Sequence, residues 1–289
     1  MMAPEAAPAA GPNAAQVEYW NQIAGPKWVG LAGAIDRRIA RIHELLLAAA
    51  DLRPGQSVLD VGCGPGTTTL ASAERVGSAG RVLGVDISVP MLQEARRRIA
   101  ELGLPNVAVI EADAEIHPLT SLGFDRVLSR FGVMFFADPV AAFRNLHRTL
   151  RTDGRLAFVC WARLADNPHW RVPIEIAEHA LGRPAIGPER APGPLALSDV
   201  TYLRGILERA GFARVAIATE SVSLIGGTPE EEASLAFRMG PAARFIEERA
   251  PEEPVRDAIR QAIAEAFRPF AAAGGTLLPA AVHVATAAP

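Results

Sequence analysis

The sequence has few of the residues that mark several large classes of protein. Only two of its 289 residues are cysteine, Cys63 and Cys160, and they do not form a Cys-x-x-Cys pair. This rules out a disulfide framework and a cysteine-rich metal site, and we expect both cysteines to be buried as small apolar residues. No cluster of His, Asp and Glu has the spacing of metal ligands either, so the sequence predicts no metal.

Long apolar runs and concentrations of positive charge are also missing. The longest apolar runs, such as 45–50, are too short to cross a bilayer, and the N-terminus lacks the basic and then apolar layout of a signal peptide. The formal net charge is −3, and no block of Lys and Arg stands out. These features argue against nucleic acid and anionic membranes as partners. The sequence therefore predicts a cytoplasmic protein with no membrane insertion.

Enough apolar sequence is present for a sizeable core. Hydrophobic residues make up 49% of the chain and charged residues 21%, which suits one large domain or a core with a smaller cap. Residues 1–13 are almost entirely Ala, Pro and Gly, so we expect a disordered tail. In 14–51 the apolar residues recur at helical spacing with a break near Gly25 and Pro26, which predicts two helices.

The middle of the chain has the pattern of a parallel sheet. Short β-branched runs alternate with amphipathic helical runs between 56 and 161, as in successive βαβ units. The expected strands are 57–61, 81–86, 107–110, 124–130 and 155–161, and the expected helices are 67–76, 89–102 and 139–150.

The last part of the chain is less regular. A stretch rich in Pro and Gly at 167–194 precedes an expected helix at 198–210 and a strand at 213–224. Two helical runs, 229–239 and 252–270, and a closing strand at 276–285 follow. The pattern divides the chain into a tail (1–13), N-terminal helices (14–51), an alternating core (52–165) and a less regular remainder (166–289).

A glycine loop follows the first expected strand, in the run VLDVGCGPGT at 58–67. Glycines at alternate positions let the backbone take positive φ and approach a ligand closely. A second expected strand ends at Asp86, about twenty residues further on, where an acid can reach the hydroxyls of a ribose. Loop and acid together indicate a nucleoside site, although Asp86 could also simply cap the helix that follows it.

The position of the third glycine separates two cofactors. A dinucleotide fingerprint, G-x-G-x-x-G, counted from Gly62 and Gly64 requires glycine where the chain has Thr67. The spacing Asp60-x-Gly62-x-Gly64-x-Gly66 instead resembles motif I of the class I S-adenosylmethionine-dependent methyltransferases. By this resemblance the loop packs against the amino-acid part of the cofactor. Asp60 would pin the loop, and would also face the cofactor's amino group through water.

Later segments resemble the same family in the same order. The resemblance assigns Asp86 to the ribose hydroxyls, Ile87 to packing on the adenine, Asp113 to the exocyclic amine of the adenine and Ala114 to a backbone N–H that the adenine accepts. Plain solvation of the loop is the alternative for Asp113. The turn at 150–156 resembles the one that enters the fifth strand in the ubiquinone and menaquinone branch. The cofactor-binding residues that we expect are Asp60, Gly62, Cys63, Gly64, Gly66, Asp86, Ile87, Met91, Asp113, Ala114, Ser129, Arg130, Trp20 and Trp28.

The resemblance also implies the fold. It predicts an α/β protein with a Rossmann-like, seven-stranded sheet in the order 3-2-1-4-5-7-6, strand 7 antiparallel, and helices on both faces. The segment 276–285 would be strand 7. Because Pro279 cannot donate to a ladder, we expect pairing to begin after it. A helical lid would come from the N-terminus and from C-terminal insertions.

Methyl transfer from a sulfonium is an in-line displacement, which needs a positioned acceptor in a dry pocket more than it needs a base. A base is required when the acceptor loses a proton. His169, just past the fifth strand, is the candidate catalytic residue, and an ordinary loop histidine beside a packing Trp170 is the alternative. Arg130 would either help to hold a carboxylate or pair with a surface acid.

The expected acceptor is a small, partly apolar molecule held between the core and the lid. Tyr19, Trp20 and Trp28 would belong to the lid or to the core. The residues that we expect to contact the acceptor are Phe131, Asn167, Trp170, Phe237 and Met239. The product would be S-adenosylhomocysteine, and the protein would be a monomer or homodimer.

Other methyltransferase branches fit the chain less well. The fourth strand is followed by SRFG rather than the Asn/Asp-Pro-Pro-aromatic stretch of DNA amino-methyltransferases, and no cysteine follows a proline as in cytosine-C5 enzymes. Two functions from other classes stay open. One is a catalytically silent, cofactor-binding regulator, and the other is an NAD-type oxidoreductase, which Thr67 argues against.

Overall fold

The computed structural model describes residues 11–119, 123–183 and 190–289. Residues 1–10 of the predicted tail lie outside the described residues. Asn13, which the sequence placed in that tail, is described and is 5% exposed. Among the described residues no helix is long and apolar enough to cross a membrane.

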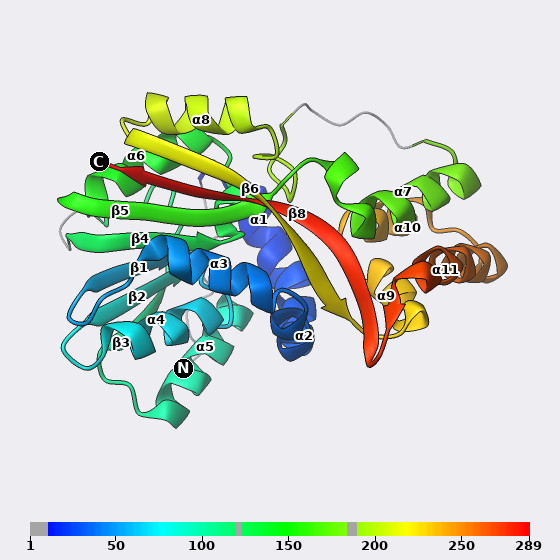
Figure 1. The fold of residues 1–289 in the computed structure, drawn as a ribbon, viewed down its shortest axis with the longest axis horizontal. Helices are drawn as coiled ribbons and strands as arrows, with labels where there is room; N and C mark the ends of the chain where they lie inside the picture. The colour runs from blue at the N-terminus through cyan, green and yellow to red at the C-terminus, as the bar shows by residue number, and fades with distance from the viewer. Residues whose placement is uncertain (1–10, 120–122, 184–189) are drawn as a thin grey trace, which may run out of the picture.

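A single twisted sheet forms the centre of the molecule (Figure 1). Its strands lie in the order β3-β2-β1-β4-β5-β8-β6, with the first five parallel and β8 antiparallel to both β5 and β6. The strands are β1 (Ser57–Val61), β2 (Arg81–Asp86), β3 (Val107–Glu111), β4 (Phe124–Arg130), β5 (Leu150–Trp161), β6 (Ala213–Gly226), β7 (Ala271–Ala272) and β8 (Gly275–Ala288). The predicted order is confirmed. The final strand is the eighth rather than the seventh because the two-residue β7 pairs with β8 just before it.

Helices cover both sides of this sheet. Figure 1 shows α3, α4 and α5 along one side and α6 and α8 along the other. The helices are α1 (Ala14–Tyr19), the π-helix η1 (Trp20–Ala24), α2 (Gly25–Arg38), α3 (Ala40–Ala50), α4 (Thr67–Val76), α5 (Val89–Leu102), α6 (Pro139–Thr149), α7 (Pro168–Leu181), α8 (Val200–Arg209), α9 (Pro229–Ala236), α10 (Pro241–Arg249) and α11 (Glu253–Phe267), with short 3₁₀ turns η2 (Gly132–Phe135), η3 (Leu164–Asp166) and η4 (Arg268–Phe270).

The strands meet in a continuous apolar core. All five residues of β1 are buried, and the last six residues of β5 are buried as well. Central parallel strands have helices on both faces, which is why these stretches read as apolar runs without alternation. The core holds the carboxyl ends of β1, β2 and β4 in fixed register, and those ends carry the predicted cofactor residues.

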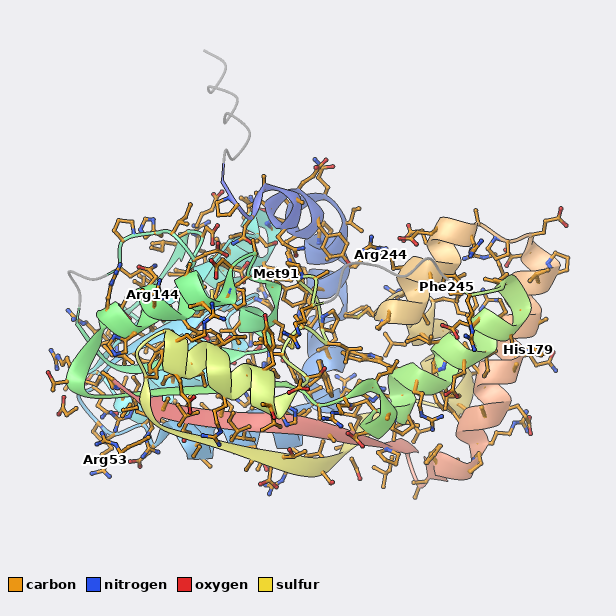
Figure 2. All side chains as sticks on the ribbon, turned by 90° about the horizontal axis from the view of Figure 1, so that it is seen from above. Arg53, Met91, Arg144, His179, Arg244 and Phe245 are labelled. Carbon is orange, nitrogen blue, oxygen red and sulfur yellow. The ribbon has the colours of Figure 1, made fainter. Side chains whose placement is uncertain are left out.

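A second group of helices forms a cap at the far end of the antiparallel pair β6–β8. This strand pair runs beyond the other strands, and α7, α9, α10 and α11 gather beside its end (Figure 1). Helix α11 packs on α9 and α7, and α10 packs on α7. Helix α2 lies between this cap and the core half of the molecule (Figure 2).

The N-terminal segment changes from the π-helix η1 to α2 at Gly25, where the sequence predicts a break, and Pro26 stands in the first turn of α2, where proline is tolerated. A further break, which the sequence did not predict, falls at Ile39. The structure corrects three expectations about local structure. The stretch at 167–194 contains helix α7, and α10 was also missed.

The third correction concerns Pro279. It pairs with Ser223 of β6 inside the ladder, so pairing does not begin after it. At this point β8 has not yet reached β5, since that pairing starts only at Val282. Pro279 therefore has a strand neighbour on one side only, which is the arrangement that a strand proline requires.

Candidate functional site

The glycine loop adopts the backbone that its sequence predicts. Gly62, Gly64 and Gly66 have φ values of 66°, 53° and 89°, in the left-handed region that favours glycine. A Cβ on Gly62 would lie 2.6 Å from the Cα of Gly132, at the end of β4. Position 62 thus requires glycine for two reasons, its positive φ and the close approach of the Gly132 backbone.

Asp86 ties the end of β2 to this loop. Its carboxylate accepts a hydrogen bond from the backbone N–H of Gly64 and another from that of Ser88, each at 2.8 Å. Burial raises the pKa of Asp86, and the backbone N–H groups oppose that rise. Each carboxylate oxygen keeps a second lone pair that a ribose hydroxyl could use.

Asp60 is fully buried beside the loop. Thr69 of α4 donates to its Oδ2 at 2.7 Å, and its Oδ1 has no hydrogen-bond partner among the described residues. Burial raises the pKa of Asp60 to about 7, and the Thr69 hydroxyl and the charge of Arg130 act in the opposite direction. A buried carboxylate oxygen without a partner is costly unless a ligand or water satisfies it.

Arg130, at the end of β4, carries the matching unsatisfied donor. Its Nη2 pairs with Oδ1 of Asp36 from α2 at 2.8 Å, and its Nη1 is buried without a partner among the described residues. In the β1–β4 ladder Asp60 stands opposite Leu128, two residues before Arg130. Since strand residues alternate between faces, Asp60 and Arg130 lie on the same face of the sheet. One acceptor oxygen of Asp60 and one donor nitrogen of Arg130, each without a partner among the described residues, therefore lie on the same face of the sheet near the glycine loop.

The turn after β3 holds the predicted adenine residues. Asp113 accepts from the side-chain amide of Asn13, whose Nδ2 lies 3.0 Å from each carboxylate oxygen. The same nitrogen lies 3.0 Å from Oε2 of Glu115. Ala114 is buried in this turn and its carbonyl accepts from Asn145. The amide of Asn13 thus occupies the acceptors that the resemblance assigns to an exocyclic amine.

The N-terminal helices are hydrogen-bonded to the turn between β2 and α5. Asn21 of η1 donates to the carbonyl of Ile87 at 2.9 Å and accepts from the N–H of Val89 at 2.8 Å. Trp20 packs edge-on against Trp28 and against Phe135 of η2, with ring centroids 6.1 and 5.0 Å apart. The segment that carries both tryptophans therefore lies against the predicted cofactor residues. Asn13 and Asn21, which make these attachments, were missed by sequence reasoning.

The remaining predicted cofactor residues are buried in supporting positions. Ser129 donates to the carbonyl of Val61 at 2.7 Å and accepts from the N–H of Gly132, so its hydroxyl joins β4 to the glycine loop. Met91 of α5 would lie 3.4 Å from a Cβ on Gly64. Cys63 and Cys160 are both buried, as expected, and burial raises the pKa of each thiol.

A cluster of aromatic rings lies at the ends of β4 and β5. Phe131 stacks on Trp161 with centroids 4.6 Å apart, and Trp161 also contacts the rings of His169 and Trp170 at 5.0 and 4.8 Å. Phe131 has a φ of 69°, a conformation that costs a non-glycine residue of the order of 1 kcal/mol and that persists only where the surroundings impose it. Such strain is common at ligand sites.

Asn167 holds the start of α7 next to this cluster. Its amide donates to the carbonyls of Ala162, Arg163 and Ala281, and its Oδ1 accepts from the N–H of Ala281. The side chain is fully buried, and its amide protons are committed to the backbone. The structure thus places Asn167 as a brace between the β5–α7 connection and β8, and not as a free hydrogen-bond donor to an acceptor.

His169 is buried with neither ring nitrogen in a hydrogen bond of good geometry among the described residues. Burial, and after it the charge of Arg38, lower its pKa to about 3, and the backbone of Pro279 acts in the opposite direction. The imidazole is therefore neutral at neutral pH. It can accept or donate one hydrogen bond, but as a proton acceptor it is weak.

The cap brings the other predicted acceptor residues near α2. Gly240 follows Met239, and a Cβ on Gly240 would lie 3.0 Å from Nε1 of Trp170. Phe237 lines a cavity of about 250 Å³ together with Lys27 of α2, Arg256 of α11 and residues of α10. Phe245 is buried within the cap, well away from Met91 of the core half (Figure 2).

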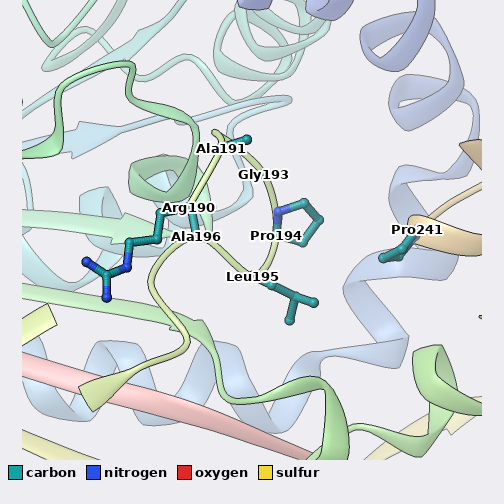
Figure 3. Close-up of a pocket in the computed structure, with 7 residues that line it drawn as sticks. All are labelled: Arg190, Ala191, Gly193, Pro194, Leu195, Ala196 and Pro241. Carbon is teal, nitrogen blue, oxygen red and sulfur yellow. The ribbon is translucent and has the colours of Figure 1, made fainter. Parts of the chain in front are cut away.

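A second cavity, of about 280 Å³, lies between the segment 190–196 and the start of α10 (Figure 3). None of the predicted site residues lines it, so it gives no support to the predicted site. In the part of the chain that the structure describes, no three His, Cys, Asp or Glu side chains are grouped as a metal site.

The fold and the loop have the geometry of a Rossmann-like nucleoside site, with Thr67 where a dinucleotide enzyme would place its third glycine. A family model of the methyltransferase domain matches residues 58–154. The ubiquinone/menaquinone biosynthesis C-methyltransferase UbiE of Klebsiella pneumoniae is 31% identical over 189 residues, which cover 60% of this chain and 74% of UbiE. The chain belongs to the class I S-adenosylmethionine-dependent methyltransferases.

Two further similarities extend this result. Aklanonic acid methyltransferase DauC of a Streptomyces species is 40% identical over 104 residues, which cover 36% of this chain and 47% of DauC. The chain thus spans less than half the length of that relative. Among solved structures, the YcgJ protein of Bacillus subtilis has a TM-score of 0.55 at 19% identity, covers 86% of this chain and 98% of its own, and shows the same fold.

Proposed function

We propose that this chain transfers the methyl group of S-adenosylmethionine to a small-molecule acceptor by in-line displacement in a closed pocket. The observation that carries the proposal is the pair of buried, unpartnered polar atoms, Oδ1 of Asp60 and Nη1 of Arg130, beside a loop of left-handed glycines. A zwitterionic amino-acid group supplies a cationic donor for the first atom and an anionic acceptor for the second, and a neutral nucleoside supplies neither charge.

The remaining residues supply the other parts of the cofactor site. Asp86 would bind the ribose diol, and the turn at Asp113 would read the adenine, as the family resemblance implies. The cofactor supplies a sulfonium-bound methyl group that is already activated for displacement. The protein's task is then to hold the acceptor in line and to keep water out, which the lid formed by α1, η1 and α2 supports.

The acceptor would lie against the aromatic cluster of Phe131, Trp161, His169 and Trp170, beneath the cap residues Phe237 and Met239. Aromatic walls favour a partly apolar, planar acceptor. The low pKa of His169 argues for a hydrogen-bonding role, in which the neutral ring orients the acceptor atom. The relatives UbiE and DauC carry small-molecule names, which supports an acceptor of that size class.

The decisive test uses S-adenosylhomocysteine release with pools of small phenols, quinols and carboxylic acids, together with calorimetric titration of S-adenosylmethionine and NAD. We expect binding of S-adenosylmethionine but not NAD, and turnover with at least one pool. In the same titration Asp86→Ala should weaken S-adenosylmethionine by about 2 kcal/mol. Binding of NAD alone would overturn the proposal. Tight cofactor binding without turnover in any pool would favour the silent regulator.

A further inference from the structure

We infer that Asp36, on the lid helix α2, is a positioning residue that aims the guanidinium of Arg130 at the carboxylate of the cofactor's amino-acid group. This inference rests on the proposed function, because it takes the ligand beside the glycine loop to be an amino-acid nucleoside. It makes one side chain of the lid part of cofactor recognition.

The two carboxylate oxygens of Asp36 bond different parts of the site, the end of β4 and the end of the glycine loop. Its Oδ1 accepts from Nη2 of Arg130 at 2.8 Å, and its Oδ2 accepts from the hydroxyl of Thr67 at 2.6 Å. Thr67 is the first residue of α4, directly after the last glycine of the loop. A single carboxylate from the lid therefore fixes both the arginine at the end of β4 and the far end of the glycine loop.

A second arginine completes this support without competing for the ligand. Nη1 of Arg98, from α5, donates to the hydroxyl of Thr67 at 3.0 Å and to the carbonyl of Pro65 at 2.8 Å. The Thr67 hydroxyl thus accepts from Arg98 and donates to Asp36, which fixes its direction. Side chains from α2 and α5 thus hold the end of the glycine loop.

The geometry of a guanidinium explains what this arrangement achieves. The group is a rigid, planar fork, so a bond that fixes Nη2 also fixes the direction of Nη1. Asp36 holds Nη2, and Nη1 is left buried and unpartnered on the face of the sheet that carries Asp60. The charge of Arg130 acts on Asp60, yet neither Nη1 nor Oδ1 of Asp60 has a partner. Two groups that served only to neutralise each other would bond directly.

His43 of α3 also lies near this pair. It is affected by the charges of both Arg130 and Asp36, and burial lowers its pKa to about 4. At neutral pH the imidazole is therefore uncharged and adds no charge of its own to the site.

The test compares two ligands that differ in the amino-acid group, whose carboxylate Arg130 would bind. S-adenosylhomocysteine has the amino-acid group, and 5′-methylthioadenosine has the same adenosine and thioether without it. We expect Asp36→Ala to weaken S-adenosylhomocysteine about tenfold, the size of one charge-assisted bond, and to leave methylthioadenosine unchanged within about twofold. Thr67 keeps its bond from Arg98 when Asp36 is removed, so the loop should stay in place. The double variant with Arg130→Ala should then bind S-adenosylhomocysteine no more weakly than Arg130→Ala alone, since the effect of Asp36 on the ligand passes through Arg130.

Two further variants keep the inference open to refutation. Arg37→Ala changes a neighbouring, exposed charge on the same turn of α2 and should alter neither affinity. Arg130→Lys replaces the rigid planar fork by a single ammonium, whose bond to Asp36 no longer fixes the direction of a second donor, so it should reduce the affinity ratio of the two ligands even if Asp36→Ala does not fold. An equal loss of both ligands, or additive losses in the double variant, would overturn the role of Asp36. A wild-type protein that binds neither ligand would instead overturn the proposed function.

Discussion

The cofactor half of the molecule and the cap are held together in different ways. In the cofactor half, Asp60, Asp86 and Arg130 stand at the ends of adjacent parallel strands, where ladder register sets their positions. In the cap, α7, α9, α10 and α11 pack on one another through their side chains, with no strand ladder between them, at the end of the long β6–β8 pair. The first arrangement allows little change in backbone or side chain, and the second allows helices to vary while the strand pair keeps its place.

This contrast suits a protein that binds one invariant ligand and one variable ligand. The strand-end site fits a cofactor that must be placed identically in each cycle. The cap fits an acceptor whose shape differs between related proteins, because changes in packed helices leave the sheet intact. The two halves should therefore respond differently to mutation.

The largest effect should come from the tightest point of the cofactor half. Gly62→Ala places a Cβ 2.6 Å from the Cα of Gly132 in a residue with a φ of 66°. We expect S-adenosylhomocysteine affinity to fall at least about a hundredfold, or roughly 2.7 kcal/mol. Isothermal calorimetry measures this directly.

Gly55→Ala is the matched control. Gly55 has a φ of 83°, and no atom lies within 4 Å of a Cβ placed there. Gly55→Ala should lower the free energy of unfolding by a similar backbone cost of about 1 kcal/mol but creates no clash, so S-adenosylhomocysteine affinity should be unchanged. Equal affinities in the two variants would show that the loop is not the cofactor site.

The largest effect on stability, as distinct from ligand affinity, concerns the attachment of the cap to helix α2. Arg38 of α2 forms an ion pair with Glu232 of α9, whose side chain is 5% exposed and also accepts from the N–H of Gly227. Glu232→Gln leaves the arginine, which is 13% exposed, without its counter-charge, so the free energy of unfolding should fall by about 3 kcal/mol. Urea denaturation followed by circular dichroism gives this value.

Glu248→Gln, which removes the acid of an exposed pair with Arg244 on α10, should cost less than about 0.5 kcal/mol. If both variants cost equally little, the cap is not fastened through Arg38. S-adenosylhomocysteine affinity should stay within about threefold in either variant, since the pair lies outside the strand-end site.

Sequence reasoning succeeded in one half and was weaker in the other for a physical reason. The bounds of β1, β2, α4 and α5 agree with the predicted ones. Glycine or proline stands near the ends of these elements, and their apolar residues recur with the period of a strand or a helix. Helix α7 was not predicted because Pro168 and Pro173 fall within it, and proline usually interrupts helical structure.

The cofactor residues carried by a motif were predictable, and their supports were not. The spacing of the glycine loop is visible in ten consecutive residues, so Asp60 and Gly62 could be assigned. Asp36 and Asn13 meet their partners across sequence separations of 94 and 100 residues, and a single sequence carries no signal for such contacts. Long-range polar contacts of this kind emerge only from the folded chain.

The smallest effect is a pH dependence confined to the cofactor half. Burial raises the pKa of Asp60 to about 7, and the groups that act on it are Thr69, Arg130 and Asp86. A carboxyl that holds its proton more tightly when folded destabilises the fold as pH rises between about 4 and 7, because the folded state then binds more protons than the unfolded state. The same deprotonation prepares Asp60 to receive an ammonium group. Cofactor-free stability should therefore fall, and S-adenosylhomocysteine affinity should rise, as pH goes from 6 to 8.

The expected gain in affinity is at most about tenfold, since the pKa lies in the middle of this range. Calorimetry at pH 6, 7 and 8 in buffers of different ionisation enthalpy would also show proton release at the lower pH. Asp60→Asn should bind more weakly and lose the pH slope, and methylthioadenosine should show no slope with either protein. An identical slope in Asp60→Asn would assign the titration to another group, and the ammonium would then have to be held by the backbone of the glycine loop instead.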